Sequence, residues 1–109
     1  MKRLKICQVN VRSLLASSKL LDLELLCASA DIDVLCVTET WLSSKVTSPQ
    51  VSLPGFQSPF RCDRPNSYRG GGLAVYVRLG LAANSVYFHD QLEAVCVRIL
   101  LPKRETLYM

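Results

Sequence analysis

Two polar side chains stand where apolar, strand-like segments of the chain end. Glu39 directly follows the apolar run at residues 34–38, and Asn10 lies at the end of the run at residues 4–11. A carboxylate beside a buried strand is costly unless it is paired or binds a cation. Ligands of open α/β sheets gather at the carboxyl ends of strands. We therefore interpret Glu39 as the centre of a site, with a paired structural Glu or an ordinary Glu leaving the sheet into solvent as the alternatives.

A β-α-β pattern in the first forty residues brings these two positions together. Residues 4–11 alternate between two faces, as a strand does. Residues 19–30 carry a leucine-rich stripe with helical spacing after the N-cap candidates Ser17 and Ser18, and residues 34–38 have the composition of a buried strand. Two strands joined through a helix run parallel, so their carboxyl ends meet at one edge of the sheet.

The rest of the chain reads as one long loop followed by strands. Residues 43–69 hold four of the five prolines and show no clear period, which predicts a functional or mobile loop. Three glycines at residues 70–72 enter a strand at 73–77, and they are not a phosphate loop because no Gly-Lys-Ser/Thr follows. Further strands are predicted at residues 85–88, 92–101 and 106–109, with turns at 90–91 and 103–105.

Basic and aromatic side chains alternate near the end of the long loop. Arg61, Arg64 and Arg69 lie there together with Phe60 and Tyr68. Guanidinium and aromatic groups interleaved in this way suit contact with a phosphate backbone. A solvated basic loop is the equally weighted alternative, since the net charge of +4 permits a nucleic-acid partner without demanding one.

The length and composition of the chain indicate one globular domain of 109 residues, and its cysteines indicate a reducing compartment. The five cysteines are odd in number and none form a CxxC pair, which disfavours a disulfide framework and a zinc site. Neither a signal-peptide pattern nor an apolar run long enough to span a bilayer is visible. We expect the nucleus or the cytoplasm, with no secretion and no membrane partner.

Four stretches occur in an order that resembles a known superfamily. They are CQVNVRSL at residues 7–14, DVLCVTETWL at 33–42, RGGGLAVYVR at 69–78 and LEAVCVRI at 92–99. Together they resemble the endonuclease/exonuclease/phosphatase superfamily, and most of all the apurinic-endonuclease-like domain of non-LTR (LINE-type) retrotransposon proteins. The resemblance covers nearly the whole chain. It implies a four-layer α/β sandwich of two mixed sheets with outer helices, and Mg²⁺-dependent cleavage of phosphodiester or phosphomonoester bonds.

The resemblance also implies roles for individual residues. Asn10 matches the Asn that ends the first strand and helps to arrange the catalytic site, and Glu39 matches the metal-binding Glu. The arginines before residue 70 fall on the side that approaches DNA, which makes Arg61, Arg64 and Arg69 candidate nucleic-acid contacts. Arg12 stands where many relatives carry an acidic residue near the metal.

The later catalytic motifs of the superfamily have no counterpart here. Its Asp-x-Asn motif, tyrosine and Ser-Asp-His motif lie further along the chain, and His89, Asp90 and Tyr108 do not match them. Residues 1–109 are therefore expected to form the N-terminal part of the domain: an α/β unit with a mixed sheet, a flanking helix and a largely missing second sheet. The expected function is that of a truncated endonuclease-like domain, inactive as this fragment.

A missing second sheet would leave apolar surface uncovered, and we expect the chain to be marginally stable or to self-associate through it. The residues that would supply this surface are Leu73, Val75, Val77, Val95, Val97 and Ile99. Two other functions stay open: a half-domain that binds nucleic acid or protein without catalysis, and a relic without function.

Overall fold

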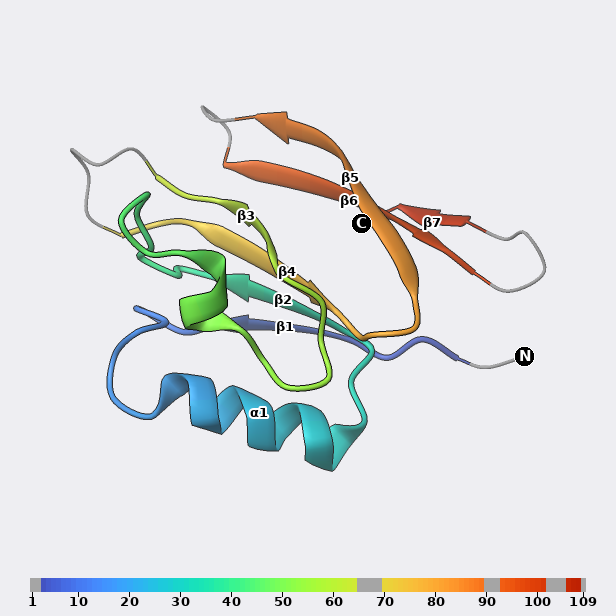
Figure 1. Cartoon of the computed structure of the whole chain (residues 1–109), viewed down its shortest axis with the longest axis horizontal. Helices are drawn as coiled ribbons and strands as arrows, with labels where there is room; N and C mark the ends of the chain where they lie inside the picture. Colours follow the sequence, from blue (N-terminus) through green and yellow to red (C-terminus); the bar gives the residue numbers. More distant parts are fainter. Residues whose placement is uncertain (1–2, 65–69, 90–92, 102–105, 109) are drawn as a thin grey trace.

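The computed structural model describes residues 3–64, 70–89, 93–101 and 106–108, and for residues 86–89 and 106–108 it describes the backbone alone. The elements in chain order are β1 (Ile6–Asn10), α1 (Lys19–Ala30), β2 (Val34–Thr38), the 3-10 helix η1 (Ser48–Val51), β3 (Phe60–Cys62), β4 (Leu73–Val77), β5 (Ala82–His89), β6 (Ala94–Leu100) and β7 (Thr106–Tyr108). One sheet has the order β1-β2-β4-β3 and the other the order β5-β6-β7. Helix α1 lies on one side of the first sheet and the second sheet lies on the other (Figure 1). This confirms the expected α/β class with a mixed sheet and a flanking helix, and the second sheet, which was expected to be largely missing, is present as a small sheet of three strands.

The β-α-β unit forms as the sequence predicted. Helix α1 and strand β2 have the expected bounds, and β1 is shorter than expected, at Ile6–Asn10. β1 and β2 are parallel, with Asn10 opposite Thr38. The helix is capped by Asp31, whose backbone is left-handed (φ 54°) and whose N–H donates to the carbonyl of Cys27, and the chain then turns into β2.

Two strand predictions need correction. The segment predicted as one long loop contains β3, which pairs antiparallel with β4, and the strand predicted at residues 85–88 extends over Ala82–His89. β3 is too short to show alternation, and the first residues of β5 are Ala, Ala and Asn, which have low strand propensity. Hydrogen-bonded pairing with a neighbouring strand, β4 for β3 and β6 for β5, gives both segments their extended conformation. The turns expected at 90–91 and 103–105 lie outside the described residues.

The first core lies between α1, the outer face of the first sheet and the loop around η1. Leu23 and Cys27 of α1 are buried there, whereas the neighbouring Leu26 is 37% exposed. Tyr76 of β4 is fully buried, and its hydroxyl donates to the carbonyl of Val51 at 2.7 Å. The buried members of this core are Val11, Leu14, Leu23, Cys27, Ile32, Leu35, Val37, Leu42, Val51, Leu53, Ala74 and Tyr76.

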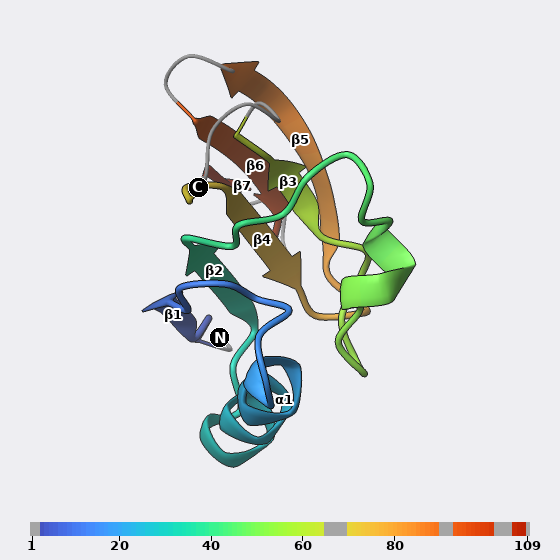
Figure 2. The same ribbon diagram turned by 90° about the vertical axis from the view of Figure 1, so that its left-hand side faces the viewer.

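The second core lies between the two sheets. Val75 and Val77 of β4 pack there against Val97 and Ile99 of β6, together with Val34. The expectation of an uncovered inner face is therefore wrong for β4, because β6 covers it. The second sheet contacts β3 and β4 (Figure 2). Towards β1 and β2 the inner face stays open as a groove of about 200 Å³, lined by Gln8, Cys36, Val37, Thr38, Leu73, Ala74, Val75 and Val95.

The cysteines behave as small apolar side chains. All five are free thiols, and burial raises the pKa of Cys27 and of Cys36, which keeps both thiols protonated at neutral pH. Among the described residues, no helix is both long enough and apolar enough to cross a membrane.

A buried carboxylate, Asp33, joins three neighbouring strands of the first sheet, β1, β2 and β4. Its Oδ2 accepts the backbone N–H of Lys5 at 2.9 Å, just before β1, and its Oδ1 accepts Nε of Arg78 at 3.1 Å, just after β4. The backbone of Asp33 also bonds to both residues, with its N–H donating to the carbonyl of Lys5 and its carbonyl accepting the N–H of Arg78, each at 2.9 Å. Arg78 donates further to exposed Asp31 at 3.0 Å and lies over the ring of Phe56.

We predict that Asp33→Asn lowers the free energy of unfolding by about 2–3 kcal/mol. Both oxygens of the carboxylate accept hydrogen bonds, and in asparagine the NH₂ group would face one of these donors in place of an acceptor. Urea denaturation followed by circular dichroism measures this change. The matched control Asp31→Asn, at the exposed end of the same arginine, should cost less than about 1 kcal/mol. Equal effects of the two substitutions would contradict the role given to Asp33.

Candidate functional site

The parallel register of β1 and β2 places Asn10 and Glu39 at the same edge of the first sheet. Asn10 lies opposite Thr38, and the pairing continues beyond the strands: Val11 N–H donates to the carbonyl of Thr38 at 3.1 Å, and Ser13 N–H donates to that of Glu39 at 2.9 Å. Asn10 is exposed and Glu39 is half-buried. An amide and a carboxylate from two strands thus lie at one edge and are accessible to a ligand.

The backbone at this edge is strained. Arg12 and Ser13 after β1, and Glu39 and Trp41 after β2, all have positive φ angles, of 48°, 84°, 56° and 57°. Non-glycine residues seldom adopt this conformation, and such residues gather at active sites and ligand-binding sites. The two strand ends that carry the candidate residues are therefore also where the described chain concentrates this strain.

The glycines at residues 70–72 complete the edge. Thr40 N–H donates to the carbonyl of Gly72 at 3.3 Å and Trp41 N–H to that of Gly71 at 2.9 Å, so β4 continues to pair with the segment after β2. A Cβ atom on Gly72 would overlap the hydroxyl of Thr40, and one on Gly71 would overlap the guanidinium of Arg64. Both residues also have positive φ. Glycine is required here for close approach of side chains as well as for the turn.

An ion pair joins the second sheet to this glycine turn. Glu93, just before β6, accepts Nη2 of Arg64 at 2.7 Å through Oε2 and the backbone N–H of Gly72 at 2.6 Å through Oε1. The hydrogen bond from Arg64 lowers the pKa of Glu93, and the bond from Gly72 lowers it further. In return, the hydrogen bond to Glu93 raises the pKa of Arg64, and the nearby charge of Glu39 acts in the same direction.

Three side chains from two segments, the one after β2 and the one after β3, converge above Gly70. A Cβ atom built on Gly70 would lie 3.5 Å from Nε1 of Trp41, 3.6 Å from Nη1 of Arg64 and 3.9 Å from Oε1 of Glu39. The sequence predicted Glu39 and Arg64 as site residues without placing them together. The structure places both over the same glycine, with the half-exposed indole of Trp41 beside them.

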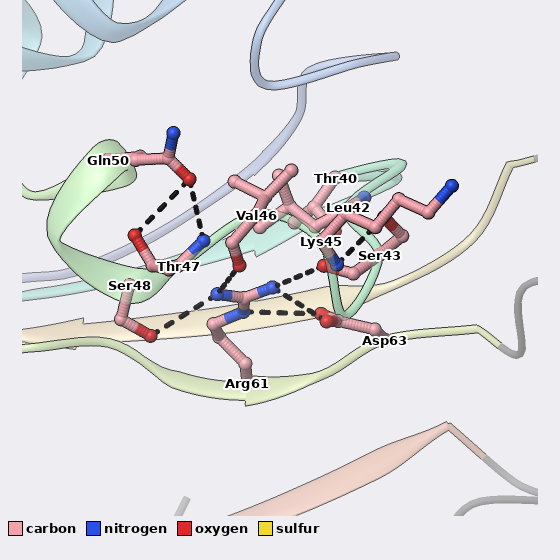
Figure 3. Close-up of polar contacts among 10 residues, drawn as sticks. All are labelled: Thr40, Leu42, Ser43, Lys45, Val46, Thr47, Ser48, Gln50, Arg61 and Asp63. Atoms are coloured by element: carbon pink, nitrogen blue, oxygen red, sulfur yellow. Dashed lines mark hydrogen bonds and ion pairs between the residues drawn. The ribbon is translucent and has the colours of Figure 1, made fainter.

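Arg61 has a different position from the one suggested by its sequence context. Its guanidinium donates to the carbonyls of Ser43 (3.2 Å) and Val46 (2.8 Å), to the hydroxyl of Ser48 (3.2 Å) and to both oxygens of Asp63 (2.6 and 3.3 Å) (Figure 3). These five bonds employ the five N–H groups of a guanidinium. Arg61 thus holds the loop around η1 onto β3 and has no N–H left for a phosphate. Arg69 lies outside the described residues.

The donor set at this edge suits a hard cation with few protein ligands. Among the described residues, no three His, Cys, Asp or Glu side chains lie close enough to hold a metal ion together. Zinc sites need three or four such ligands. Mg²⁺ is often held by one or two carboxylates and keeps several waters, and the half-buried Glu39 with the exposed amide of Asn10 fits that pattern.

Sequence reasoning missed Glu93 and Trp41 as members of this edge. Glu93 opens the apolar run that becomes β6, and its partner Arg64 lies 29 residues earlier in the chain, so no local pattern connects the two. Trp41 follows Glu39 by two residues, and this short distance along the chain was the feature of the sequence that could have predicted its place at the edge.

Comparison with known proteins identifies a family for this arrangement. A family model described as the Endonuclease/Exonuclease/phosphatase family matches residues 7–108. No curated protein sequence matches the chain. The family match includes β1 from its second residue, β2, the glycine turn and β6, which are the segments that form the edge.

We predict that the ion pair of Glu93 makes the free energy of unfolding depend on pH in the acidic range. Because its pKa is lower in the folded chain, Glu93 stabilises the fold above its unfolded pKa, and this stabilisation is lost as the pH falls through the folded value. Urea denaturation between about pH 5 and pH 3 should therefore show a steeper loss of unfolding free energy in wild type than in Glu93→Gln. The variant Glu24→Gln, at an exposed position of α1, should follow wild type. A Glu93→Gln profile parallel to wild type would refute the assignment.

Proposed function

The chain belongs to the endonuclease/exonuclease/phosphatase family, and from this premise we propose that residues 1–109 are part of a Mg²⁺-dependent endonuclease domain that acts on phosphodiester bonds in DNA. Nuclease or phosphatase chemistry follows from the family. The choice of a LINE-type retrotransposon endonuclease rests on the wording of the four motifs. The observation that carries the proposal is the juxtaposition of Asn10 and Glu39 at the carboxyl ends of two paired parallel strands.

In this proposal Glu39 is the metal ligand and Asn10 helps to orient the scissile phosphate. When bound, Mg²⁺ neutralises charge that develops on the phosphate during cleavage. Glu39 is suited to its role because its backbone bonds to Ser13 and its left-handed φ fix the direction in which the side chain leaves the sheet. Asn10 is suited because its exposed amide can donate to a phosphate oxygen and accept from a water.

The residues present support binding better than turnover. Hydrolysis also needs a group that activates water and one that stabilises the leaving oxygen. The chain has no match to the superfamily's Asp-x-Asn and Ser-Asp-His motifs. We therefore propose that the 109-residue chain by itself binds its metal and DNA without cleaving. A half-domain kept for binding alone is the second candidate, and the placement of Arg64 at the edge favours it.

We also propose that the chain acts in a reducing compartment, nucleus or cytoplasm, because all five thiols are free. Self-association is proposed through the open part of the inner face. Ile6 of edge strand β1 is 43% exposed there, beside the groove that ends at Val95.

We predict that Glu39→Ala abolishes binding of Mn²⁺, used as a paramagnetic substitute for Mg²⁺, in a titration followed by electron paramagnetic resonance. The physical reason is that Glu39 supplies the carboxylate of the site. Glu24→Ala removes the same side chain from exposed α1 and should leave the titration unchanged. Equal Mn²⁺ binding by wild type and Glu39→Ala would exclude Glu39 as the ligand.

Nicking of supercoiled plasmid separates the two candidates. We expect no nicking by the folded wild-type chain with or without Mg²⁺. If the wild-type chain nicks plasmid in the presence of Mg²⁺ and Glu39→Ala does not, Glu39 is supported as the metal ligand and the proposed inactivity is disproved. A chain that neither nicks plasmid nor binds Mn²⁺ or DNA would disprove both candidates.

Self-association has its own measurement. Sedimentation velocity of the wild-type chain should show a weight-average mass that rises with concentration, and Ile6→Lys should shift the distribution towards the 12.1 kDa monomer because it places a charge on the open face. The control is Leu21→Lys at an exposed position of α1, which should not change the distribution. A wild-type chain that is monomeric at all concentrations would contradict the proposal.

A further inference from the structure

We propose that the outward side of helix α1 binds a basic amphipathic helix of another protein. The surface, called the leucine face from here on, consists of Leu21, Leu25 and Ala28, all of them exposed. A hollow beside Ala28 takes one apolar side chain of the partner. The inference goes beyond the proposed function and does not depend on it.

Helix α1 is apolar on two opposite sides. Leu23 and Cys27 are buried in the first core, whereas Leu21 and Leu25 are 55% and 57% exposed. At 3.6 residues per turn, the three residues of the leucine face lie within about 40° of the direction opposite Leu23. No other described element covers this side of the helix (Figure 1 and Figure 2). A surface helix normally carries polar residues there, and a helix that is apolar all round is normally buried.

The exposed leucines gather on this helix. Of the eight large apolar side chains that are exposed in the described residues, three belong to α1: Leu21, Leu25 and Leu26. Single exposed leucines are ordinary, but a contiguous apolar group marks an interaction surface. Leu21 and Leu25 form an i, i+4 ridge, and the small side chain of Ala28 continues it at i+7. A ridge of this kind packs into the groove of a second helix.

A hollow of about 260 Å³ lies beside the leucine face. It is lined by Glu24, Cys27 and Ala28 of α1, by residues 54–56 and by Arg78. A Cβ atom built on Gly55 would meet no atom within 4 Å, so the hollow is open on that side. A dry cavity of about 150 Å³ already holds benzene. The hollow therefore has room for one leucine or phenylalanine side chain of a partner.

Two carboxylates flank the leucine face. Asp22 and Glu24 lie about 100° to either side of Leu23 on the helix, so that one stands at each edge of the face. Both are exposed, and among the described residues neither forms an ion pair. Asp22 accepts the hydroxyl of Ser18 at 3.2 Å. A partner helix with Lys or Arg on both edges of its apolar stripe is complementary to these carboxylates.

The basic residues near α1 bond to groups of the chain itself. Lys19 donates to the carbonyl of Val11 at 2.7 Å, Lys5 donates to that of Ala30 at 3.2 Å, and Arg78 pairs with Asp31 and Asp33. These three cations stand against four carboxylates, those of Asp31, Asp33 and the two flanking residues. Negative charge is therefore in excess on this side of a chain whose net charge is +4.

The same charges disfavour other occupants. A second copy that docked α1 against α1 would bring Asp22 and Glu24 of both copies together, and like charges across an interface cost affinity. A helix that lies on an anionic membrane carries Lys and Arg beside its apolar side, whereas α1 carries acids there. A basic helix of another protein is the occupant that satisfies both the leucines and the carboxylates.

Binding of a labelled model peptide tests the proposal. The probe is a peptide of leucine and lysine, about 18 residues long so that it can form a helix, with leucine along one side and lysine on both flanks. A scrambled peptide of the same composition is the control. The amphipathic peptide should bind the wild-type chain and shift the amide signals of residues 21–28 and 54–56 in ¹H–¹⁵N spectra. Equal binding of the two peptides, or shifts confined to other residues, would overturn the proposal.

Two substitutions separate the apolar and the charged contributions. Leu25→Gln removes the apolar side chain, keeps a high helix propensity and should weaken peptide binding roughly tenfold. Leu100→Gln on β6, where the leucine is 49% exposed, is the matched control and should bind as wild type does. Asp22→Asn should weaken binding about threefold at low salt and make it less dependent on salt. Equal binding by Leu25→Gln and Leu100→Gln would overturn the leucine face, and an unchanged salt dependence in Asp22→Asn would overturn the basic partner.

Circular dichroism checks the folding of each variant, and Leu21→Gln replaces Leu25→Gln if the latter does not fold. The other occupants are tested on the same variants. If Leu25→Gln lowers the weight-average mass of the chain in sedimentation velocity, the leucine face is a contact between copies. If the wild-type chain binds vesicles of anionic phospholipid and Leu25→Gln does not, it is a membrane surface. Either result would overturn the proposal, and the absence of both supports it.

Discussion

The buried carboxylate of Asp33 holds together the three strands on which the site depends. It lies in the turn between α1 and β2, bonds to Lys5 before β1 and pairs with Arg78 after β4. A buried charge of this kind stabilises a fold only when it is fully paired, and it then disfavours other registers, since a shifted strand would leave it unpaired. Asp33 acts at the end of the sheet opposite Glu39, yet the register that it supports decides which residues meet at the site edge.

The site edge follows from that register. In-register pairing brings Asn10 beside Thr38, and the pairing continues into segments whose left-handed residues re-aim their side chains. The second sheet then contributes through Glu93, which bonds to the glycine turn and to Arg64. The geometry of the strand pair thus supplies coarse placement, and a charged contact with the second sheet places the guanidinium of Arg64 next to Glu39.

Local patterns were sufficient for the elements that bury one face and insufficient for contacts between distant segments. The helix at residues 19–30 and the strand at 34–38 were predictable because their apolar spacing is clear. β3 was not, because three residues carry no period and its pairing with β4 decides its conformation. The same holds for the arginines: Arg61 and Arg64 look alike in sequence, but one serves the loop and the other the edge, and only their distant partners distinguish them.

The central claim is that a divalent cation binds at the shared edge of β1 and β2. Paramagnetic broadening of amide signals by substoichiometric Mn²⁺, recorded in two-dimensional ¹H–¹⁵N spectra of the folded chain, tests it most directly. The account predicts that the signals of Val11, Thr40 and Gly72 broaden first, because their amides flank Asn10 and Glu39 in the sheet. Broadening centred on the acidic residues Asp22 and Glu24 of α1, with the edge unaffected, would contradict it.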